Sequence, residues 1–208
     1  MAQAARERLL NFAHRRLVWA SMGGEQLSDE ALMLQYRDGD AGAFDLLYAR
    51  HKGALFRYCL RHCGQRSIAE ETFQDVWMRV IGARLRYQAR AKFTTWLYRI
   101  AHNRIIDGYR SDHSGRVQSL DGDESEIEPA ASPLDDPQRR ASSDQQAARL
   151  QAMLATLPAE QRDVFLLHEE AGLSLEAIAE ASGVGRETAK SRLRYALSKL
   201  RAALKDEQ

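Results

Sequence analysis

The sequence predicts an all-α protein of two small helical domains joined by a flexible acidic linker, the C-terminal domain being a helix-turn-helix. Three observations predict this class. Apolar residues recur at helical spacing on both sides of residues 113–140. That central segment has no periodic apolar face, and nowhere do apolar and polar residues alternate over a useful strand length. The 208 residues suffice for about one to two domains.

Charge is distributed in blocks, although the net charge is only +1. Residues 79–116 contain nine Arg and Lys against two acids, and residues 186–205 contain seven against one. Residues 117–138, between them, contain seven acids and no Arg or Lys. This pattern favours two surfaces for a polyanion, separated by a segment that repels it. Ordinary solvated helix faces are the alternative interpretation.

The N-terminus shows no targeting segment. No run of about eighteen apolar residues occurs, so membrane insertion is not expected. His14, Arg15 and Arg16 interrupt the longest N-terminal apolar stretch, which argues against a signal peptide. We therefore expect a cytoplasmic protein. Residues 1–26 are interpreted as a leader, and translation from Met22 is an alternative.

Residues 27–112 are predicted to form the first domain. Ser28 is a candidate N-cap, followed by acids in the first helical turn, where the helix dipole favours them. The Asp-Gly-Asp sequence at 38–40 indicates a turn, and Gly64 is expected to end the second helix. Two further helices are predicted over about 68–81 and 94–109. The second helix presents one apolar face, formed by Phe44, Leu47, Tyr48, Leu55, Cys59 and Cys63.

The two cysteines lie four residues apart on that apolar face, with His62 between them and His51 before them. A metal or thiol sensor would need a fourth ligand and exposure. Because buried free cysteine is common, core packing is the favoured interpretation.

Residues 113–140 combine the acidic tract with three of the four prolines, Pro129, Pro133 and Pro137. Such a composition buries too little apolar surface to offset the entropy of ordering, so a flexible linker is predicted. The helical pattern resumes near residue 141, and residues 141–208 are predicted to form the second domain.

The helix-turn-helix is predicted over residues 173–193. Ser174 can cap its first helix, Ala179 is small enough for a close crossing, and Gly183 can supply a turn with positive φ. The second helix begins near Arg186. Its predicted buried stripe is Ala189, Leu193, Ala196, Leu197, Leu200 and Leu204.

The opposite face of that second helix is a candidate DNA-binding surface. The first residues of a recognition helix reach base edges in the major groove. Arg and Lys can donate to guanine, and Glu can accept from cytosine. A plain amphipathic hairpin within a bundle is the alternative. The candidate residues are Arg186, Glu187, Thr188, Lys190 and Arg194, with Ser191 and Arg192 better placed for phosphate.

A second candidate surface mixes aromatic rings with cations over residues 86–104. Rings beside cations are typical of single-strand binding, because bases stack on the rings while the cations follow the backbone. A flipped base must also be held in a pocket that offsets its unstacking. Core packing is the favoured interpretation for Trp96 and Ile100. Exposure is expected for Tyr98, Arg99 and His102, and Arg86, Tyr87, Arg90 and Lys92 lie just before them.

Three stretches together resemble one family. They are residues 69–77 (AEETFQDVW), residues 93–110 (FTTWLYRIAHNRIIDGYR), and residues 157–167 (LPAEQRDVFLL) with the helix-turn-helix after them. In this order and spacing the sequence resembles the extracytoplasmic-function (ECF) class of bacterial RNA polymerase sigma factors, over roughly residues 27–204. The linker is too short for the extra middle domain of housekeeping sigma factors.

The resemblance implies an alternative sigma factor that binds core RNA polymerase at its clamp and flap regions and directs it to promoters. Promoter DNA would be bound both as duplex and as a melted strand, and an anti-sigma factor is a further candidate partner. The linker would run towards the RNA exit path. Polymerase binding would involve Glu71, Gln74, Asp75 and Trp77. The downstream element would be melted and bound by Arg86, Tyr87, Arg90, Lys92, Thr95, Tyr98, Arg99, His102, Asn103 and Arg110. The upstream element would be contacted by the recognition-helix residues named above.

The sequence departs from the family pattern at Ala189 and in the loop at 88–91. Ala189 stands where a β-branched residue is common, and the loop at 88–91 is more basic than usual. A stand-alone helix-turn-helix regulator and a sigma mimic without DNA contacts remain the competing hypotheses. No Gly-rich phosphate loop, nucleophile elbow or metal-ligand cluster indicates an enzyme, and no cofactor is expected.

Overall fold

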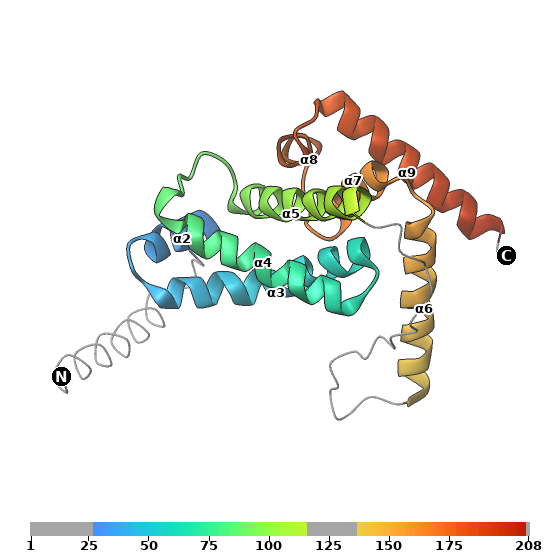
Figure 1. Cartoon of the computed structure of the whole chain (residues 1–208), viewed down its shortest axis with the longest axis horizontal. Coiled ribbons are helices and arrows are strands. Elements are labelled where there is room, and N and C mark those ends of the chain that lie inside the picture. The colour runs from blue at the N-terminus through green and yellow to red at the C-terminus, as the bar shows by residue number, and fades with distance from the viewer. Residues whose placement is uncertain (1–26, 116–136, 207–208) are drawn as a thin grey trace.

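Helices account for the architecture of residues 27–115 and 137–206, which are the residues described by the computed structural model. Figure 1 shows their arrangement. Within these ranges, no helix combines the length and the apolar character that a membrane crossing needs. The helices are α2 (Asp29–Arg37), α3 (Ala41–Cys63), α4 (Arg66–Ala83), α5 (Phe93–Gly115), α6 (Pro137–Ala155), α7 (Ala159–Glu169), α8 (Leu175–Ser182) and α9 (Arg186–Asp206), with a short 3₁₀ turn at Arg84–Arg86.

Local capping signals place the N-terminal helices. The side chain of Ser28 accepts a hydrogen bond from the Ala31 amide at 3.2 Å, as predicted. Asp40 caps α3 by accepting from the Gly42 amide at 3.1 Å. Gly64 ends α3 with a φ of 74°, a left-handed conformation that favours glycine.

The long helices α3, α4 and α5 bury their apolar faces against one another (Figure 1). The buried cluster includes Leu47 and Leu55 of α3, Val76 and Val80 of α4, and Leu97 of α5. Each of these side chains is removed from solvent. Burial of one such side chain contributes about 1.5–3 kcal/mol to stability.

Cys59 packs in the same core and is fully buried. Burial and the neighbouring Cys63 raise the pKa of the Cys59 thiol to about 12, so Cys59 is a neutral apolar side chain near neutral pH. Among the described residues, no group of three or more His, Cys, Asp or Glu side chains is placed to hold a metal ion. The structure therefore places Cys59 in the core.

The C-terminal helices follow the predicted helix-turn-helix closely. Ser174 caps α8 by accepting from the Ala177 amide at 3.3 Å, and Gly183 forms the turn with a φ of 66°. The helix α9 then begins at Arg186. Of the predicted buried stripe, Ala189, Ala196 and Leu200 are buried. Leu204 is 46% exposed, because α9 continues beyond the helices that cover its first turns.

The segment predicted as a linker is helical at both ends. The helix α5 continues to Gly115, and α6 begins at Pro137, where a first-turn proline costs no intrahelical hydrogen bond. The predicted leader, residues 1–26, and most of the predicted linker, residues 116–136, lie outside the residues that the structure describes.

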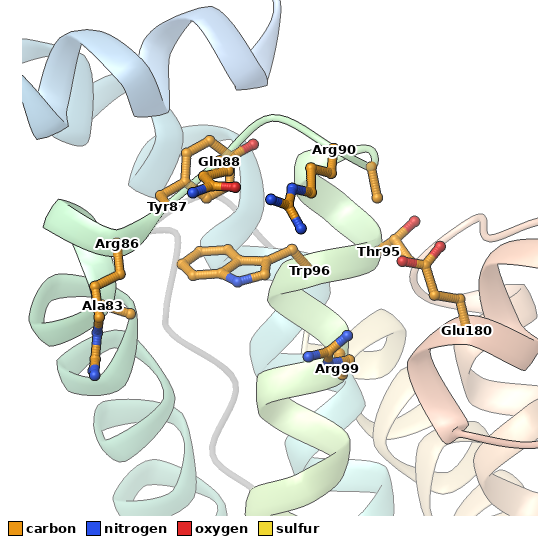
Figure 2. Close-up of a pocket in the computed structure, with 10 residues that line it drawn as sticks. Ala83, Arg86, Tyr87, Gln88, Arg90, Thr95, Trp96, Arg99 and Glu180 are labelled. Atoms are coloured by element: carbon orange, nitrogen blue, oxygen red, sulfur yellow. The ribbon is translucent and has the colours of Figure 1, made fainter.

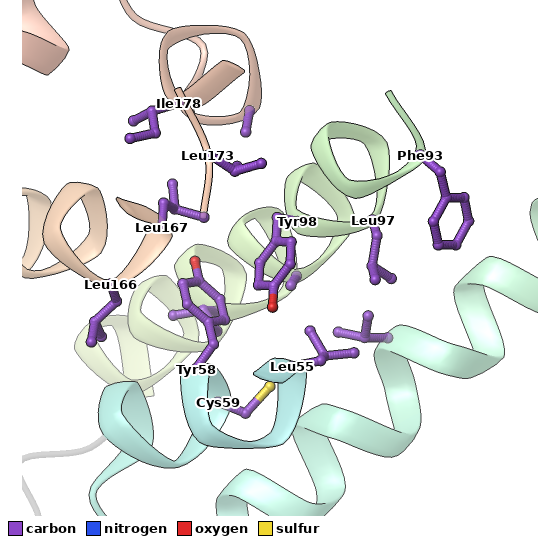
Figure 3. Packing of buried hydrophobic residues seen from close by; sticks show 14 of the residues in the cluster. Leu55, Tyr58, Cys59, Phe93, Leu97, Tyr98, Leu166, Leu167, Leu173 and Ile178 are labelled. Carbon is purple, nitrogen blue, oxygen red and sulfur yellow. The ribbon is translucent and has the colours of Figure 1, made fainter. Parts of the chain in front are cut away.

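The two groups of helices lie against each other. The helices α7 and α8 cover one side of α5 and the end of α3 (Figure 1). Figure 3 shows Leu167 and Leu173 facing Tyr98 across this contact. The helix α5 is therefore enclosed from two directions, which the spacing of its residues did not predict.

Candidate nucleic-acid interface

A cavity of about 480 Å³ lies between the end of α4, the following loop and the start of α5. Figure 2 shows the ring of Trp96 across its middle, with Tyr87 above it. The cavity is lined by Ala83, Arg86, Tyr87, Gln88, Arg90, Ala91, Thr95, Trp96, Arg99 and Glu180. Its size and its mixture of rings and cations suit a planar base with an adjoining phosphate.

Aromatic packing forms the floor of this cavity. The ring of Tyr87 meets Trp96 edge to face at 5.0 Å, and Phe93 lies 5.8 Å from Trp96. Tyr87 is buried, and burial together with Glu30 and Asp29 raises its pKa to about 12, so its phenol is neutral. Trp96 is half-buried: one part of the ring packs and the other lines the cavity.

Cations surround this floor. Arg86, Arg90 and Arg99 are exposed, and none of the three forms an ion pair with a carboxylate within residues 27–115 and 137–206. Three such guanidinium groups around one cavity attract an anion and can donate in pairs to phosphate oxygens.

A carboxylate from α2 fixes the start of α5 beneath this cavity. Glu30 accepts a hydrogen bond from the Phe93 amide at 2.7 Å. This contact satisfies one amide of the first turn of α5 and places a negative charge at the positive end of its dipole. The α2 helix thus positions the loop and the cavity.

The remaining predicted strand-binding residues are divided between two sides of α5. Lys92 and Asn103 are exposed, as is Arg99. Arg110 lies in α5, but its side chain is outside the described part of the chain. Of these exposed residues, only Arg99 lines the cavity.

The expected exposure of Tyr98 is wrong, and His102 is half-buried rather than exposed. Tyr98 is 1% exposed and Thr95 is 3% exposed. The nitrogen Nδ1 of His102 lies 2.9 Å from a carboxylate oxygen of Asp163 in α7. These three side chains lie on the side of α5 that α7 and α8 cover, so long-range packing buries Tyr98 and Thr95 and leaves His102 half-buried.

The predicted polymerase surface lies on the outer side of α4. Glu71 and Gln74 are exposed, and Asp75 is half-buried. Arg104 of α5 holds Asp75 at 2.7 Å and lies 3.5 Å from Glu71. These acids are therefore positioned from the neighbouring helix.

Trp77 does not share that surface. It is 5% exposed and packs against Tyr48 and Phe44, with ring centroids 5.1 and 5.6 Å away. The aromatic cluster between α3 and α4 encloses this side chain, so it is not part of the exposed surface, and its role in polymerase binding stays a prediction. The neighbouring Met78 is 65% exposed. The sequence analysis did not single out this large apolar side chain.

The start of α9 presents the predicted recognition face. Arg186, Glu187, Thr188, Lys190 and Arg194 are exposed, and Ser191 and Arg192 are half-buried. Most of the cations on this face lie near carboxylates. The ion pairs join Arg186 to Glu176 at 2.5 Å and to Glu187 at 3.1 Å, Lys190 to Glu187 at 3.8 Å, and Arg192 to Glu160 at 3.9 Å.

Two family models match the chain. Residues 47–114 match Sigma-70 region 2, and residues 153–202 match Sigma-70, region 4. The ECF RNA polymerase sigma factor RpoE of Cereibacter sphaeroides is 33% identical over 177 residues, covering 82% of this chain and 92% of that protein. The chain belongs to the ECF class of RNA polymerase sigma factors.

Solved structures show the same fold. The structure of CnrH in complex with the cytosolic domain of CnrY is 24% identical, with a TM-score of 0.66 over 86% of this chain and 99% of that one. The sigma factor RpoE of Bartonella quintana, in complex with the anti-sigma factor NepR, is 20% identical, with a TM-score of 0.58 over 79% of this chain and 98% of that one.

The protein is accordingly an alternative sigma factor that directs RNA polymerase to promoters. In this sigma factor, α3 to α5 belong to region 2, and α7 to α9 belong to region 4. The stand-alone regulator is not favoured, because both regions match in order along one chain.

A buried polar cluster joins the two regions of the sigma factor. Asp163 of region 4 is 3% exposed and accepts a hydrogen bond from the Tyr58 hydroxyl at 2.6 Å. The nitrogen Nε2 of His62 lies 3.3 Å from the same carboxylate. Burial alone raises the pKa of Asp163, but hydrogen bonding and charge from His102 and His62 outweigh burial and hold that pKa well below its usual range. The carboxylate is therefore ionised at neutral pH.

Proposed function

We propose that the sigma factor uses three separate surfaces to start transcription. The exposed acids of α4 bind the polymerase clamp, and the cavity at the start of α5 holds a base flipped from the melted downstream element. The first turns of α9 contact the upstream element as duplex. The region 4 domain also contacts the polymerase flap, and the protein works in the cytoplasm without chemistry of its own.

The observation that carries the strand-binding role is the cavity around Trp96. A half-buried ring offers a stacking surface whose position is already set by Tyr87 and Phe93. Three exposed guanidinium groups lie around it. A pre-positioned ring loses little entropy when a base stacks on it, and nearby cations bind the adjoining phosphates.

The proposal for α9 follows from where its charges lie. Arg186 and Lys190 are one helical turn apart at the start of the helix, the end that enters the major groove. Both side chains are solvent-exposed, so DNA can reach them without refolding the domain. Glu187, between them, supplies an acceptor for cytosine.

We also propose an anti-sigma factor as a partner. The support is that the RpoE of Bartonella quintana, which shares this fold, was solved in complex with the anti-sigma factor NepR. Binding of a purified anti-sigma domain should then suppress promoter-dependent transcription by this protein.

The decisive experiment is run-off transcription with bacterial core polymerase on a library of promoter fragments, with and without the protein. Transcripts that require the protein support the proposal, and their start sites define the promoter. Tight duplex binding by the protein alone, with no transcripts, would instead support a stand-alone regulator.

The polymerase surface has its own test. Glu71→Arg reverses an exposed charge on α4 and should weaken core polymerase binding, measured by fluorescence anisotropy of a labelled protein. Asp45→Arg, an exposed charge reversal on α3, is the matched control. Because side chains at rim positions contribute modestly, we expect about a five- to thirtyfold loss for Glu71→Arg. Equal affinities of the two variants would contradict the assignment.

A further inference from the structure

The acids proposed for polymerase binding and the helix proposed for strand binding meet at one side chain, Arg104. The nitrogen Nε of Arg104, on α5, donates to a carboxylate oxygen of Asp75 at 2.7 Å. Its Nη2 lies 3.5 Å from a carboxylate oxygen of Glu71. Both acids belong to α4, so a single guanidinium of α5 occupies two carboxylates of the proposed polymerase surface.

Arg104 also lies in line with the cavity. Trp96, Ile100 and Arg104 are spaced four residues apart, and side chains at this spacing lie on successive turns of one helix face. Eight residues of helix measure about 12 Å, so Arg104 stands about two turns beyond the stacking ring. A strand with one base on Trp96 can therefore bring a neighbouring phosphate within reach of this long cationic side chain.

The cations around the cavity are not held in the way that Arg104 is held. Arg86, Arg90 and Arg99 line the cavity, and in the parts of the chain that the structure describes none of them pairs with a carboxylate. The charge of Arg104 is instead balanced by the acids of α4. A phosphate must compete with these carboxylates, so Arg104 attracts it only weakly while they are in place.

The contact at Arg104 can open without separating α4 from α5. The side chains of Asp75 and Glu71 are 46% and 71% exposed, so a cationic partner can reach both carboxylates. Apolar packing joins the two helices independently of this contact. A second ion pair, between Arg79 of α4 and Asp107 of α5 at 3.9 Å, also connects them.

We propose that Arg104 is a further strand-binding residue, released when the polymerase clamp takes its carboxylates. In the free protein Arg104 is bound to Asp75 and Glu71. In the holoenzyme, cationic groups of the clamp pair with these acids, and Arg104 turns to a phosphate of the melted strand. Polymerase binding thereby strengthens strand binding through an exchange of ion-pair partners. The inference rests on the proposed roles of α4 and α5.

The first test uses the free protein and single-stranded DNA. Asp75→Asn removes the closest carboxylate of Arg104 and should free its guanidinium for phosphate. Glu70→Gln is the matched control, because Glu70 is a similarly exposed acid of α4 that pairs with Arg66 of its own helix at 2.9 Å. Each variant removes one negative charge from α4, so a difference between them reports on Arg104.

Strand affinity is measured by anisotropy over a range of salt concentrations, with the non-template strand of downstream elements that run-off transcription identifies. Asp75→Asn should bind the strand about two- to fivefold more tightly than Glu70→Gln. Its plot of log affinity against log salt should be steeper by up to about 0.7, the value for one more phosphate contact on a single strand. Equal affinities and equal slopes in the two variants overturn the exchange.

Replacement of Arg104 in the Asp75→Asn background shows whether the gain passes through the guanidinium. Asp75→Asn combined with Arg104→Gln has the net charge of the parent and should return both the affinity and the salt slope to parent values. Asp75→Asn combined with Arg104→Lys retains a cation and should keep the steeper slope. A gain that survives Arg104→Gln overturns the proposal. Circular dichroism checks that each variant is folded.

The second test adds core polymerase and needs no change to the acids. In the holoenzyme, Arg104→Gln should bind the strand about three- to tenfold more weakly than Arg104→Lys, because only the lysine can contact a phosphate. The difference between the two variants should be smaller in the free protein, where the acids hold the cation. An equal difference with and without polymerase overturns the exchange.

Trp96→Ala in the same strand assay separates this inference from the proposed function. Weaker strand binding by Trp96→Ala, without the expected differences at Arg104, overturns the exchange and leaves the cavity as the strand-binding site. Unchanged strand affinity in Trp96→Ala contradicts the proposed role of the cavity, whatever the variants of Arg104 show.

Discussion

The helices α5 and α9 are both proposed to bind DNA, but they are held very differently. Leu97 and Tyr98, adjacent on α5, are both buried, since α5 packs against α3 and α4 and also against α8. The helix α9 is covered on one side only, mainly through the small Ala189 and Ala196. A helix enclosed from two sides contributes to the fold as well as to binding, whereas a one-sided helix can specialise in recognition.

The largest expected effect tests this difference through stability. Leu97→Ala empties a fully buried site and should lower the free energy of unfolding by about 2–5 kcal/mol. Leu193→Ala on α9 removes a half-buried side chain and should cost about 1–2 kcal/mol. Urea unfolding followed by circular dichroism measures both. A larger loss of unfolding free energy for Leu193→Ala than for Leu97→Ala would contradict the conclusion that α5 is the more enclosed helix.

The next effect concerns strand binding by α5. Trp96→Ala removes the stacking ring and should weaken binding of the melted strand by about 1–3 kcal/mol, without changing duplex binding at α9. Trp96→Phe retains a ring and serves as the matched control, with much of the affinity restored. Anisotropy titrations with both probes measure the two affinities. Loss of strand affinity in Trp96→Phe as large as in Trp96→Ala would point to a packing defect rather than lost stacking.

A third prediction concerns sequence discrimination by α9. Lys190→Ala should cost about 1–3 kcal/mol of discrimination at one base pair of the upstream element. Competition binding against a set of single-base variants of that element measures it, with Lys199→Ala, an exposed position further along α9, as control. Equal weakening on every sequence would assign Lys190 to phosphate contact instead.

The smallest effect concerns the pre-positioning of Arg186. Glu176→Gln removes a carboxylate 2.5 Å from the guanidinium of Arg186, where both side chains are more than half exposed. Exposed ion pairs contribute little, so duplex affinity should change by less than about fivefold. The salt dependence of binding should steepen slightly, because Arg186 is freed to contact phosphate. A loss above tenfold would show that the carboxylate itself participates in recognition.

Local signals explain what the sequence predicted well. Ser28, Ser174 and Gly183 act within their own turns, so capping and turn rules locate the helix ends directly. Composition predicts a linker that includes Pro137, although proline at a first helical position is itself a signal for the start of a helix.

Long-range packing explains what the sequence did not predict. Tyr98 and His102 have helical spacing that suits either an exposed or a covered side, and only the arrival of α7 decides between them. Trp77 similarly appears beside surface acids in the sequence, while three other rings enclose it in space. The surface roles of the site residues therefore remain proposals even where their helices were predicted correctly.

The turn at Gly183 has a mechanical consequence. It joins α8 to α9 with a backbone hydrogen bond from the Val184 amide to the Ala179 carbonyl at 3.1 Å. The helix α8 also packs on α5, and α9 carries the exposed candidate recognition face. The two surfaces proposed for DNA are therefore connected through one short helix, so a displacement of α9 would reach α5 through α8.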